Sequence, residues 1–572
     1  MQLAAAGAGA LSLVLLISLP KPCPAAYPPS AEGASYAVAT DNADATRAAI
    51  EVMASGGNAV DGAIAAALTL GVVSPTASGL GGGGFALVYT AKDQKVVAVD
   101  FRERAPASYD GSTLFTARPH GPSSGVPPWT GPRGVVVGVP GEPAGLEHLS
   151  KRFGKKSLSD VAAPAVALAT QGFYASKHLA DLTRMFKDRL VRIPTLDTAF
   201  VPGGAPAAFG SRIKRPELAA TLARFGAEGK KSIYEGPTAA KIADAVHGVG
   251  GTMTKEDLSS YAVKERAPLS RTVDGRTIYA MPAPSAGGLM VVETLAMFGA
   301  NKSSALAPMG FGSSAYLHTL AEAMRGAMAD RGRLAGDPDI DPNVNAAFQK
   351  ALEPAQLAAR RAKIDPQKTH APTEFKTKEQ GTTHLVVADA EGNVVALTTT
   401  VNGPFGAGLI AGDTGILLNN ELDDFTSPDD AKPFGFTDGG PNRPRPKARP
   451  ISSMSPTIVV ENGMPILALG GSGGSRIATG TTQAALARLV FDLDPAACVS
   501  HPRIHTQGVD LFVDREIPAD VRDGLKGRGE TVKEEPWQGS GIQMIAWQRP
   551  QGGPARLSAA SDPRKGGFSA AR

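Results

Sequence analysis

The chain has 572 residues, of which 42% are hydrophobic and 20% are charged, and its formal net charge is +4. This composition provides ample apolar material for the core of a sizeable enzyme. It gives no sign of nucleic-acid binding, because no run of Lys and Arg with interleaved aromatic residues occurs. No internal repeat of fixed period is evident, which argues against a solenoid or a propeller.

The N-terminus predicts export. An apolar run from Leu11 to Leu19 lies in a stretch rich in Ala, Gly and Leu, and small residues precede position 27. We therefore expect a signal peptide over 1–26, a Pro/Ala-rich leader over 27–36, and a periplasmic or secreted product. No basic residue precedes the apolar run and Lys21 follows it, so an uncleaved anchor or a mis-assigned start remains an alternative. No later segment has the roughly 20 uncharged residues of a spanning helix, so no stable membrane span is expected.

Two cysteines occur, Cys23 and Cys498, and the first would leave with the signal peptide. A single remaining cysteine cannot form an internal bridge, so stability must come from the core. Cys498 lies in Ala-Ala-Cys-Val and is expected to be a small buried residue rather than a nucleophile.

Residues 37–360 alternate helical patterns with short strands. Apolar helices are predicted at Ala43–Ala54 and Val60–Leu70, joined by Ser-Gly-Gly-Asn, which is typical of a helix C-terminus. The glycine run 81–84 precedes a strand and indicates tight packing or a turn. The stretch 106–132, rich in Pro, Gly and Ser, is predicted to be loop.

The most informative stretch is Gly381-Thr382-Thr383-His384. Residues 361–381, with lysines among Pro and Thr, are expected to be exposed and flexible. They give way to two β-rich runs around a Gly-Asn turn, which predict a hairpin. A hydroxyl residue thus stands at the head of a strand, after a glycine, as a self-cleaving N-terminal nucleophile requires. Cleavage of the Gly381–Thr382 bond would give Thr382 a free α-amino group, with an unperturbed pKa of about 7.7 to 8.0, that can accept the proton of its own hydroxyl.

Further on, strands are predicted at Thr457–Val460 and Ile466–Leu469, and a helix at about 475–491. Strands with flanking helices in both halves of the chain indicate a layered α/β body.

The run 470–474, Gly-Gly-Ser-Gly-Gly, supports a rival interpretation. It satisfies G-x-S-x-G, follows an apolar strand and opens a helix, which is the setting of a nucleophile elbow in an α/β-hydrolase. The triad would then be Ser472 with His501 or His505 and with Asp492 or Asp494. Against this, a run with so many glycines easily matches the pattern by chance. The backbone amides of a glycine-rich turn at the start of a helix also serve as anion or oxyanion donors.

The other motif alternatives are weaker. The run 470–474 lacks the Lys-Ser/Thr ending of a P-loop and the later acidic residue of a dinucleotide site. His501 and His505 have i, i+4 spacing, but Pro502 and the absent Glu argue against a metalloprotease helix. We expect no metal and no cofactor.

Motifs over roughly 37–564 resemble, in order and spacing, those of the γ-glutamyltranspeptidase (glutathione hydrolase) family of N-terminal nucleophile hydrolases. In the first half these are GGNAVDGAIAAALTLGVVSP (56–75), GLGGGGF (79–85) and DFRERAP (100–106). In the second half they are GTTH (381–384), TTTVN (398–402), GILLNNELDDF (415–425), RPISSMSPTIV (449–459), GGSGGSR (470–476) and ASDPR (560–564). The resemblance implies an α/β fold, a four-layer αββα sandwich formed by both halves of a self-cleaved precursor. The large subunit would be 37–381, and the small subunit 382–572 would begin with the catalytic threonine.

The resemblance also implies roles for catalytic residues. Thr382 resembles the family's nucleophile, and Thr400 resembles the threonine whose hydroxyl orients it. Gly473 and Gly474 resemble the oxyanion donors, whose amides would stabilise the charge that develops on the γ-carbonyl. Thr400 could otherwise be an ordinary strand residue among three threonines, and Thr383 could be just the next strand position.

An amino-acid headgroup needs opposite charges placed close together, and an Arg fork suits a planar carboxylate. By the resemblance, the α-carboxylate clamp would be Arg102 with Ser452 and Ser453, and the α-ammonium site would be Asn402, Glu421 and Asp424. Alone, each charged residue could be a solvated surface group, but together they make a zwitterion pocket. Asp423 is expected to point elsewhere if this stretch is extended.

The loop between the last acidic residue of this pocket and the two serines is rich in Pro, Gly and Asp and resembles the family's lid. It carries Phe434 where many members have Tyr, with Phe436 as the other alignment. The phenol hydroxyl that would close the lid is therefore missing. A closed lid would shield the acyl-enzyme from water.

The implied reaction has two steps. Thr382 attacks the γ-glutamyl amide of glutathione or a related compound, and water or an amino acid or dipeptide acceptor then resolves the γ-glutamyl ester. One alternative is a cephalosporin or glutaryl acylase of the same family, against which Asn402, Glu421 and Asp424 argue. The other is an unprocessed binding protein, against which the intact Thr382 and Thr400 argue.

Overall fold

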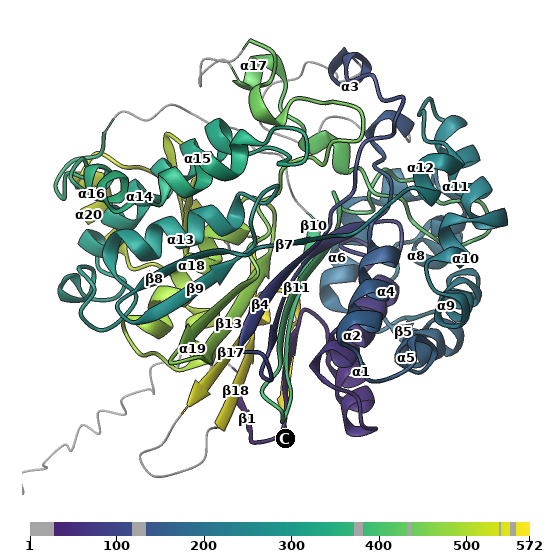
Figure 1. Ribbon diagram of the computed structural model, residues 1–572, viewed down its shortest axis with the longest axis horizontal. Coiled ribbons are helices and arrows are strands. Elements are labelled where there is room, and N and C mark those ends of the chain that lie inside the picture. The colour runs from purple at the N-terminus through teal and green to yellow at the C-terminus, as the bar shows by residue number, and fades with distance from the viewer. Residues whose placement is uncertain (1–27, 117–132, 371–380, 432–436, 537–538, 549–555) are drawn as a thin grey trace, which may run out of the picture.

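The computed structural model of the protein describes residues 28–116, 133–370, 381–431, 437–536, 539–548 and 556–572. Two seven-stranded sheets pack face to face, and helices cover the outer face of each sheet (Figure 1). The predicted four-layer αββα sandwich is therefore confirmed.

Both large sheets are antiparallel at every described pairing. In spatial order the first holds β19 (Phe568–Ala571), β2 (Ala37–Thr40), β10 (Gly381–Ala388), β11 (Val394–Asn402), β3 (Gly83–Thr90), β4 (Lys95–Phe101) and β7 (Lys264–Arg266). The second holds β1 (Ala31–Gly33), β18 (Arg556–Ser561), β17 (Gly541–Gln548), β13 (Met464–Ser472), β12 (Thr457–Glu461), β9 (Arg276–Ala280) and β8 (Leu269–Val273). Each sheet takes strands from both sides of residue 381, so neither part of the chain completes a sheet alone.

The helices that precede residue 260 pack outside the first sheet. The predicted helices at 43–54 and 60–70 are confirmed as α1 (Ala43–Ala54) and α2 (Ala59–Val73). Asn42 caps α1 and Asn58 caps α2, each accepting bonds from the first amides of its helix. The others are α3 (Ser112–Thr116), α4 (Glu142–Phe153), α5 (Leu158–Gln171), α6 (Lys177–Met185), α7 (Lys187–Leu190), α8 (Pro194–Phe200), α9 (Pro216–Glu228), α10 (Lys231–Tyr234), α11 (Gly236–His247) and α12 (Lys255–Ser259).

The second sheet is covered by later helices, and a small sheet lies beside them. The predicted strands and helix after residue 455 are confirmed as β12, β13 and α18 (Arg476–Leu489). The other helices are α13 (Gly287–Phe298), α14 (Ser314–Leu334), α15 (Asn343–Ala351), α16 (Pro354–Arg361), α19 (Pro495–Ser500) and α20 (Ala519–Gly527). The small sheet holds β14 (Ile504–Thr506), β15 (Asp510–Asp514) and β16 (Thr531–Glu535), and a two-stranded one holds β5 (Phe173–Tyr174) and β6 (Arg212–Ile213).

The predicted hairpin is β10 and β11, and it crosses the middle of the first sheet. Leu385 and Val387 on β10 point into the core under the helices, whereas Val386 and Ala388 point into the core between the sheets. This alternation follows from the two-residue period of a strand. It places Thr382 and His384 on the face that looks toward the second sheet, and a Cβ on Gly470 of β13 would indeed strike the His384 ring.

Two further predictions about packing are confirmed. A Cβ on Gly81 would lie 2.0 Å from the Leu417 carbonyl oxygen, and one on Gly82 would lie 2.0 Å from the Thr400 carbonyl oxygen. The glycine run therefore serves close backbone packing. Cys498 is a buried free cysteine, and burial raises the pKa of its thiol to about 12.

Two predictions about loops need correction. The stretch 106–132 contains α3 at Ser112–Thr116, and 117–132 lies outside the described residues. Gly381 is not part of a flexible segment, because it is a buried residue of β10. Residues 371–380 and the predicted signal peptide with Cys23 lie outside the described residues. No helix in the described part of the chain is long and apolar enough to cross a membrane.

Candidate active site

Thr382 stands at a β-bulge at the head of β10. Gly381 pairs with Asn402 and Thr382 pairs with Thr400, so Val401 is an extra residue on β11. Such a bulge interrupts the ladder and re-aims side chains. A Cβ on Gly381 would lie 2.3 Å from the Asn402 carbonyl oxygen, so the close approach of the two strands requires a glycine before Thr382.

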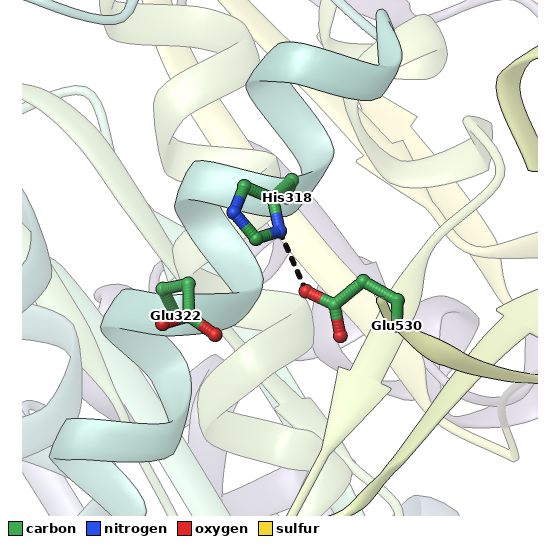
Figure 2. Close-up of side chains that lie close together, drawn as sticks. All are labelled: His318, Glu322 and Glu530. Atoms are coloured by element: carbon green, nitrogen blue, oxygen red, sulfur yellow. Dashed lines mark hydrogen bonds and ion pairs between the residues drawn. The ribbon is translucent and has the colours of Figure 1, made fainter. Parts of the chain in front are cut away.

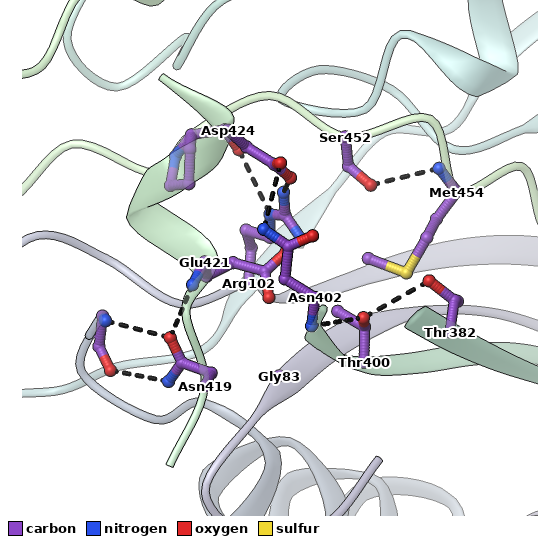
Figure 3. Close-up of polar contacts among 12 residues, drawn as sticks. Gly83, Arg102, Thr382, Thr400, Asn402, Asn419, Glu421, Asp424, Ser452 and Met454 are labelled. Atoms are coloured by element: carbon purple, nitrogen blue, oxygen red, sulfur yellow. Dashed lines mark hydrogen bonds and ion pairs between the residues drawn. The ribbon is translucent and has the colours of Figure 1, made fainter. Parts of the chain in front are cut away.

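The hydroxyl of Thr400 connects the two sides of the Gly381–Thr382 bond. Its Oγ1 lies 3.3 Å from Thr382 Oγ1 and accepts the Asn402 amide N–H at 2.8 Å (Figure 3). The same hydroxyl donates to the Gly381 carbonyl oxygen. Because Thr400 Oγ1 accepts from an amide, its own proton is directed at that carbonyl. The Thr400 hydroxyl therefore contacts both the candidate nucleophile, Thr382 Oγ1, and the Gly381 carbonyl oxygen.

Gly473 and Gly474 form the turn from β13 into α18. Their φ angles of 121° and 65° lie where glycine is favoured, and a Cβ on Gly473 would lie 2.4 Å from the Gly539 carbonyl oxygen. The preceding residue, Ser472, accepts a hydrogen bond from Lys565 Nζ at 2.8 Å, and the same Nζ lies 3.5 Å from the Thr382 carbonyl oxygen. The glycine turn is thus close to Thr382 across the space between the sheets.

Arg102 follows β4 and is buried, with 1% of its surface exposed. Its Nη2 donates to Asp424 Oδ2 at 2.7 Å and its Nη1 donates to Glu421 (Figure 3). The same Nη2 also donates to the Ile451 carbonyl at 2.6 Å. Glu421 and Asp424 reach the same guanidinium because Glu421–Asp424 is a 3₁₀ turn, in which residues three apart lie on one side. The stretch is therefore not extended, and Asp423 instead accepts a bond from Asn420 at 3.1 Å.

The remaining predicted pocket residues lie around this ion-pair cluster. Asn402 Nδ2 donates to Asp424 Oδ1 at 3.1 Å. Ser452 Oγ accepts the Met454 amide at 3.1 Å, and Ser453 Oγ accepts Arg331 Nε at 3.0 Å. The structure thus brings the predicted clamp and ammonium site together, and their opposite charges contact each other directly. Phe434 and Phe436 lie outside the described residues.

Asn419 is a positioning residue that sequence reasoning missed. Its side-chain Oδ1 accepts the amides of Gly138 and Glu421, at 2.9 and 3.0 Å, and its Nδ2 donates to the carbonyls of Gly81 and Gly138, both at 2.8 Å. This buried amide ties the glycine run to the turn that carries the acidic pair. The sequence signal that could have identified it is the Asn-Asn dipeptide directly before Glu421.

Two buried glutamates next to the site also escaped prediction. Burial raises the pKa of Glu103 to about 8, against the opposing effect of the adjacent Arg102. Burial raises the pKa of Glu142 to about 7, and the carboxyl of Glu142 accepts the Thr399 hydroxyl. A carboxyl with a pKa near 8 is mostly neutral at pH 7, so Glu103 adds little negative charge beside Glu421 and Asp424.

The rival serine triad is not assembled. The Ser472 hydroxyl contacts Lys565 and the Gly541 carbonyl, whereas His505 Nδ1 contacts Thr479 and His501 Nδ1 contacts the Pro502 carbonyl. A nucleophile elbow also belongs to a sheet of mainly parallel strands, and both large sheets here are antiparallel.

One cluster of metal-ligand residue types occurs in the described part of the chain, at His318, Glu322 and Glu530 (Figure 2). His318 Nδ1 contacts Glu530 at 2.7 Å. Arg325 donates to both glutamates, and His370 contacts Glu322. The carboxylates are already paired with a guanidinium, so the cluster is a buried ion-pair network in which a metal cation would meet a fixed positive charge.

The family model for γ-glutamyltranspeptidase matches residues 45–572. The chain belongs to the γ-glutamyltranspeptidase family. It is 36% identical to glutathione hydrolase 2 of Arabidopsis thaliana, over 93% of each chain. It is 34% identical to the glutathione hydrolase proenzyme of Escherichia coli, covering 92% of this chain and 90% of that protein.

Solved structures agree with this family assignment. Cephalosporin acylase from Bacillus halodurans superposes with a TM-score of 0.82 at 26% identity, covering 98% of this chain and 99% of that one. Helicobacter pylori γ-glutamyltranspeptidase superposes with a TM-score of 0.51 at 32% identity, covering 57% of this chain and 91% of that one. The sandwich of this γ-glutamyltranspeptidase family member is of the N-terminal nucleophile hydrolase type, as predicted.

We expect Thr400→Val to slow the predicted cleavage of the Gly381–Thr382 bond by about 10²- to 10³-fold, the usual loss for one donor to a developing oxyanion. The valine keeps the shape of threonine and removes the hydroxyl that donates to the Gly381 carbonyl. Thr400→Ser retains that hydroxyl and should cleave at close to the wild-type rate. The measurement is the fraction of intact chain over time by mass spectrometry, and equal rates for Val and Ser would contradict the assignment.

Proposed function

We propose that this member of the γ-glutamyltranspeptidase family is an autoprocessed γ-glutamyltransferase and glutathione hydrolase with Thr382 as its N-terminal nucleophile. The observation that carries the proposal is the position of Thr382 and Thr400 at the bulge, beside the buried cluster of Arg102, Glu421 and Asp424. The names of the relatives, glutathione hydrolase and glutathione hydrolase proenzyme, support both the activity and the maturation.

Maturation begins with attack of Thr382 Oγ1 on the Gly381 carbonyl carbon. The Thr400 hydroxyl donates to the carbonyl oxygen as it becomes negative, and the C–N bond then breaks to leave an ester and a free α-amine. Water hydrolyses the ester. The products are a large subunit ending at Gly381 and a small subunit of 382–572, held together because both large sheets contain strands of each.

Substrate recognition uses charges that already face each other. The α-carboxylate of a γ-glutamyl group takes the Arg102 guanidinium, and the α-ammonium takes Asp424 with Glu421 and Asn402. The zwitterion thus inserts between Arg102 and its two acidic partners, so that each buried charge keeps an opposite charge beside it, which limits the desolvation cost of the bound headgroup. A donor without the ammonium would leave the two carboxylates facing its own carboxylate.

Turnover uses the same nucleophilic oxygen as maturation but different oxyanion donors. The free α-amine of Thr382 takes the hydroxyl proton, the Thr382 oxygen attacks the γ-carbonyl, and the amides of Gly473 and Gly474 stabilise the oxyanion. The leaving amine takes the proton, which gives cysteinylglycine from glutathione. Water or the amine of an amino acid or dipeptide acceptor then attacks the γ-glutamyl ester and regenerates Thr382.

We also propose that the chain is exported, with a signal peptide over 1–26, and that Phe434 lies in a lid over the pocket. The signal peptide rests on the apolar run and the small residues that follow it. The lid rests on the Pro-, Gly- and Asp-rich loop between the acidic pair and Ser452.

The acylase alternative has one observation in its favour, the superposition on a cephalosporin acylase over nearly the whole chain. The ammonium-site residues favour the γ-glutamyl substrate. The experiment compares γ-glutamyl-p-nitroanilide with glutaryl-p-nitroanilide, which differ only in the α-amino group. A strong preference for the first supports the proposal, and a preference for the second makes the protein an acylase.

Asp424→Ala is expected to lower kcat/KM for γ-glutamyl-p-nitroanilide by about 10²-fold or more, mainly through KM, because truncating one partner of a buried charge pair costs about 2 to 5 kcal/mol. The glutaryl donor, which has no ammonium, should lose far less. Asp423→Asn is the matched control, because Asp423 is the neighbouring acid and its contact is with Asn420. Equal losses for both donors would show that Asp424 acts on the fold rather than on the ammonium.

A further inference from the structure

A buried lysine and a buried aspartate lie beside the head of β10, and the reaction described above uses neither. Asp41 follows β2, and Lys565 closes the 3₁₀ turn Pro563–Lys565 after β18; each is 8% exposed. Lys565 Nζ donates to Ser472 Oγ at 2.8 Å and lies 3.5 Å from the Thr382 carbonyl oxygen. Asp41 also interacts electrostatically with the Lys565 ammonium, so the two buried charges form a pair.

The two charges face different residues of the strand. Asp41 Oδ2 accepts the Thr383 hydroxyl at 3.0 Å and the His384 amide at 3.4 Å, and its Oδ1 accepts Gln543 Nε2 at 2.6 Å. The ammonium of Lys565 faces residue 382 itself. The pair is therefore a dipole whose positive end points at the residue that becomes the N-terminus after cleavage.

The other charged groups packed around Lys565 balance one another. Asp562 is paired with Arg503 at 2.7 Å and with Arg564 at 3.2 Å, and Arg564 also reaches Asp514 at 3.1 Å. His178 on α6 is near enough to interact with Lys565, but burial lowers its pKa to about 4, so it is neutral at pH 7. Burial lowers the pKa of Lys565, whereas Asp41 and Asp562 raise it.

We propose that Lys565 is a positioning residue whose ammonium, held in place by Asp41 and Ser472, keeps the α-amine of cleaved Thr382 in its neutral, proton-accepting form. This inference rests on the proposed N-terminal nucleophile. The physical reason is that a buried cation disfavours a second cation nearby. The amine nitrogen and the carbonyl oxygen belong to the same residue, so the ammonium lies within about 7 Å of the nitrogen. At that separation a partly balanced charge shifts an amine pKa downward by about one unit.

The same ammonium donates to Ser472, just before Gly473, so a test must separate charge from hydrogen bonding. Lys565→Gln keeps a donor and removes the charge, and Lys565→Arg keeps the charge. Lys533→Gln removes an exposed lysine of the same part of the chain. The readout is the pH profile of kcat/KM for γ-glutamyl-p-nitroanilide, whose acidic limb reports the free enzyme's base.

For Lys565→Gln we expect the acidic limb to move up by about one pH unit, with the limbs of Lys565→Arg and Lys533→Gln within about 0.3 unit of wild type. The direction follows from the charge: without the cation the amine stays protonated to higher pH. A limb that coincides with wild type, or a uniform loss at every pH, would overturn the inference and leave Lys565 a purely structural residue.

Should Lys565→Gln remain uncut, the wild-type protein provides the deciding measurement. The rate at which cyanate carbamylates the Thr382 α-amine, followed by small-subunit mass across pH, gives the pKa of that amine directly. A value of about 7 or below supports the inference, and one at or above the unperturbed 7.7 to 8.0 refutes it. A wild-type protein with no chain beginning at Thr382 would refute the proposed function instead, so the two failures are distinguishable.

Discussion

Thr382→Ala is expected to leave the chain whole and to lower the γ-glutamyl anilide rate by about 10⁴-fold or more, as removal of a catalytic nucleophile typically does. One substitution removes both the group that attacks Gly381 and the group that would later carry the γ-glutamyl ester. Wild-type protein should give two chains, the smaller beginning at Thr382. Intact mass and N-terminal sequencing measure the cleavage, and the anilide assay measures the activity.

Thr382→Ser is the matched variant. It keeps the hydroxyl and the α-amine and should still cleave itself, with reduced turnover. An uncut Thr382→Ala protein that retains full activity would contradict the N-terminal nucleophile. Ser472→Ala would then be the next variant to assay, although the contacts of Ser472 with Lys565 and Gly541 do not suit a nucleophile.

The sequence predicted the secondary-structure elements well because these depend on local patterns. Capped apolar helices, alternating strands and the Gly-Asn turn each act over a few residues, and each is found where it was expected. The candidate site residues were predicted from the resemblance of their motifs to those of the γ-glutamyltranspeptidase family, and their roles stay predictions. The structure brings Asp424 into contact with Arg102, and Thr382 into contact with Thr400.

The remaining features depend on contacts between distant parts of the chain. The bulge at Thr382 exists because Gly381 meets Asn402, and no local pattern marks which strand residue is extra. The 3₁₀ turn that brings Glu421 and Asp424 onto one guanidinium looks like an extended acidic stretch in the sequence. Lys565 is about 180 residues from Thr382 in the chain, and only the folded sandwich brings its ammonium to that carbonyl.

The largest effect on stability is expected at a second cluster, away from the active site. Arg325 on α14 donates to Glu322 and Glu530, and the three side chains are at most 2% exposed. Arg325→Met should lower the free energy of unfolding by about 3 to 5 kcal/mol, because it removes the guanidinium that pairs with both buried carboxylates. The measurement is denaturant unfolding, with the anilide assay on the folded protein as a second readout.

Arg333→Met is the control, because it lies on the same helix and also pairs with an acid three residues away, Asp330, but its side chain is 57% exposed. A pair with one solvated partner is worth at most about 1 kcal/mol, so this variant should unfold close to wild type.

The double variant of Glu322→Gln and Glu530→Gln should recover much of the loss when added to Arg325→Met, since it removes the uncompensated charges. If Arg325→Met and Arg333→Met lowered the free energy of unfolding equally, burial of the network would not determine its contribution to stability. Glu530 belongs to the proposed small subunit and Arg325 to the large one, so this ion pair would connect the two cleaved chains.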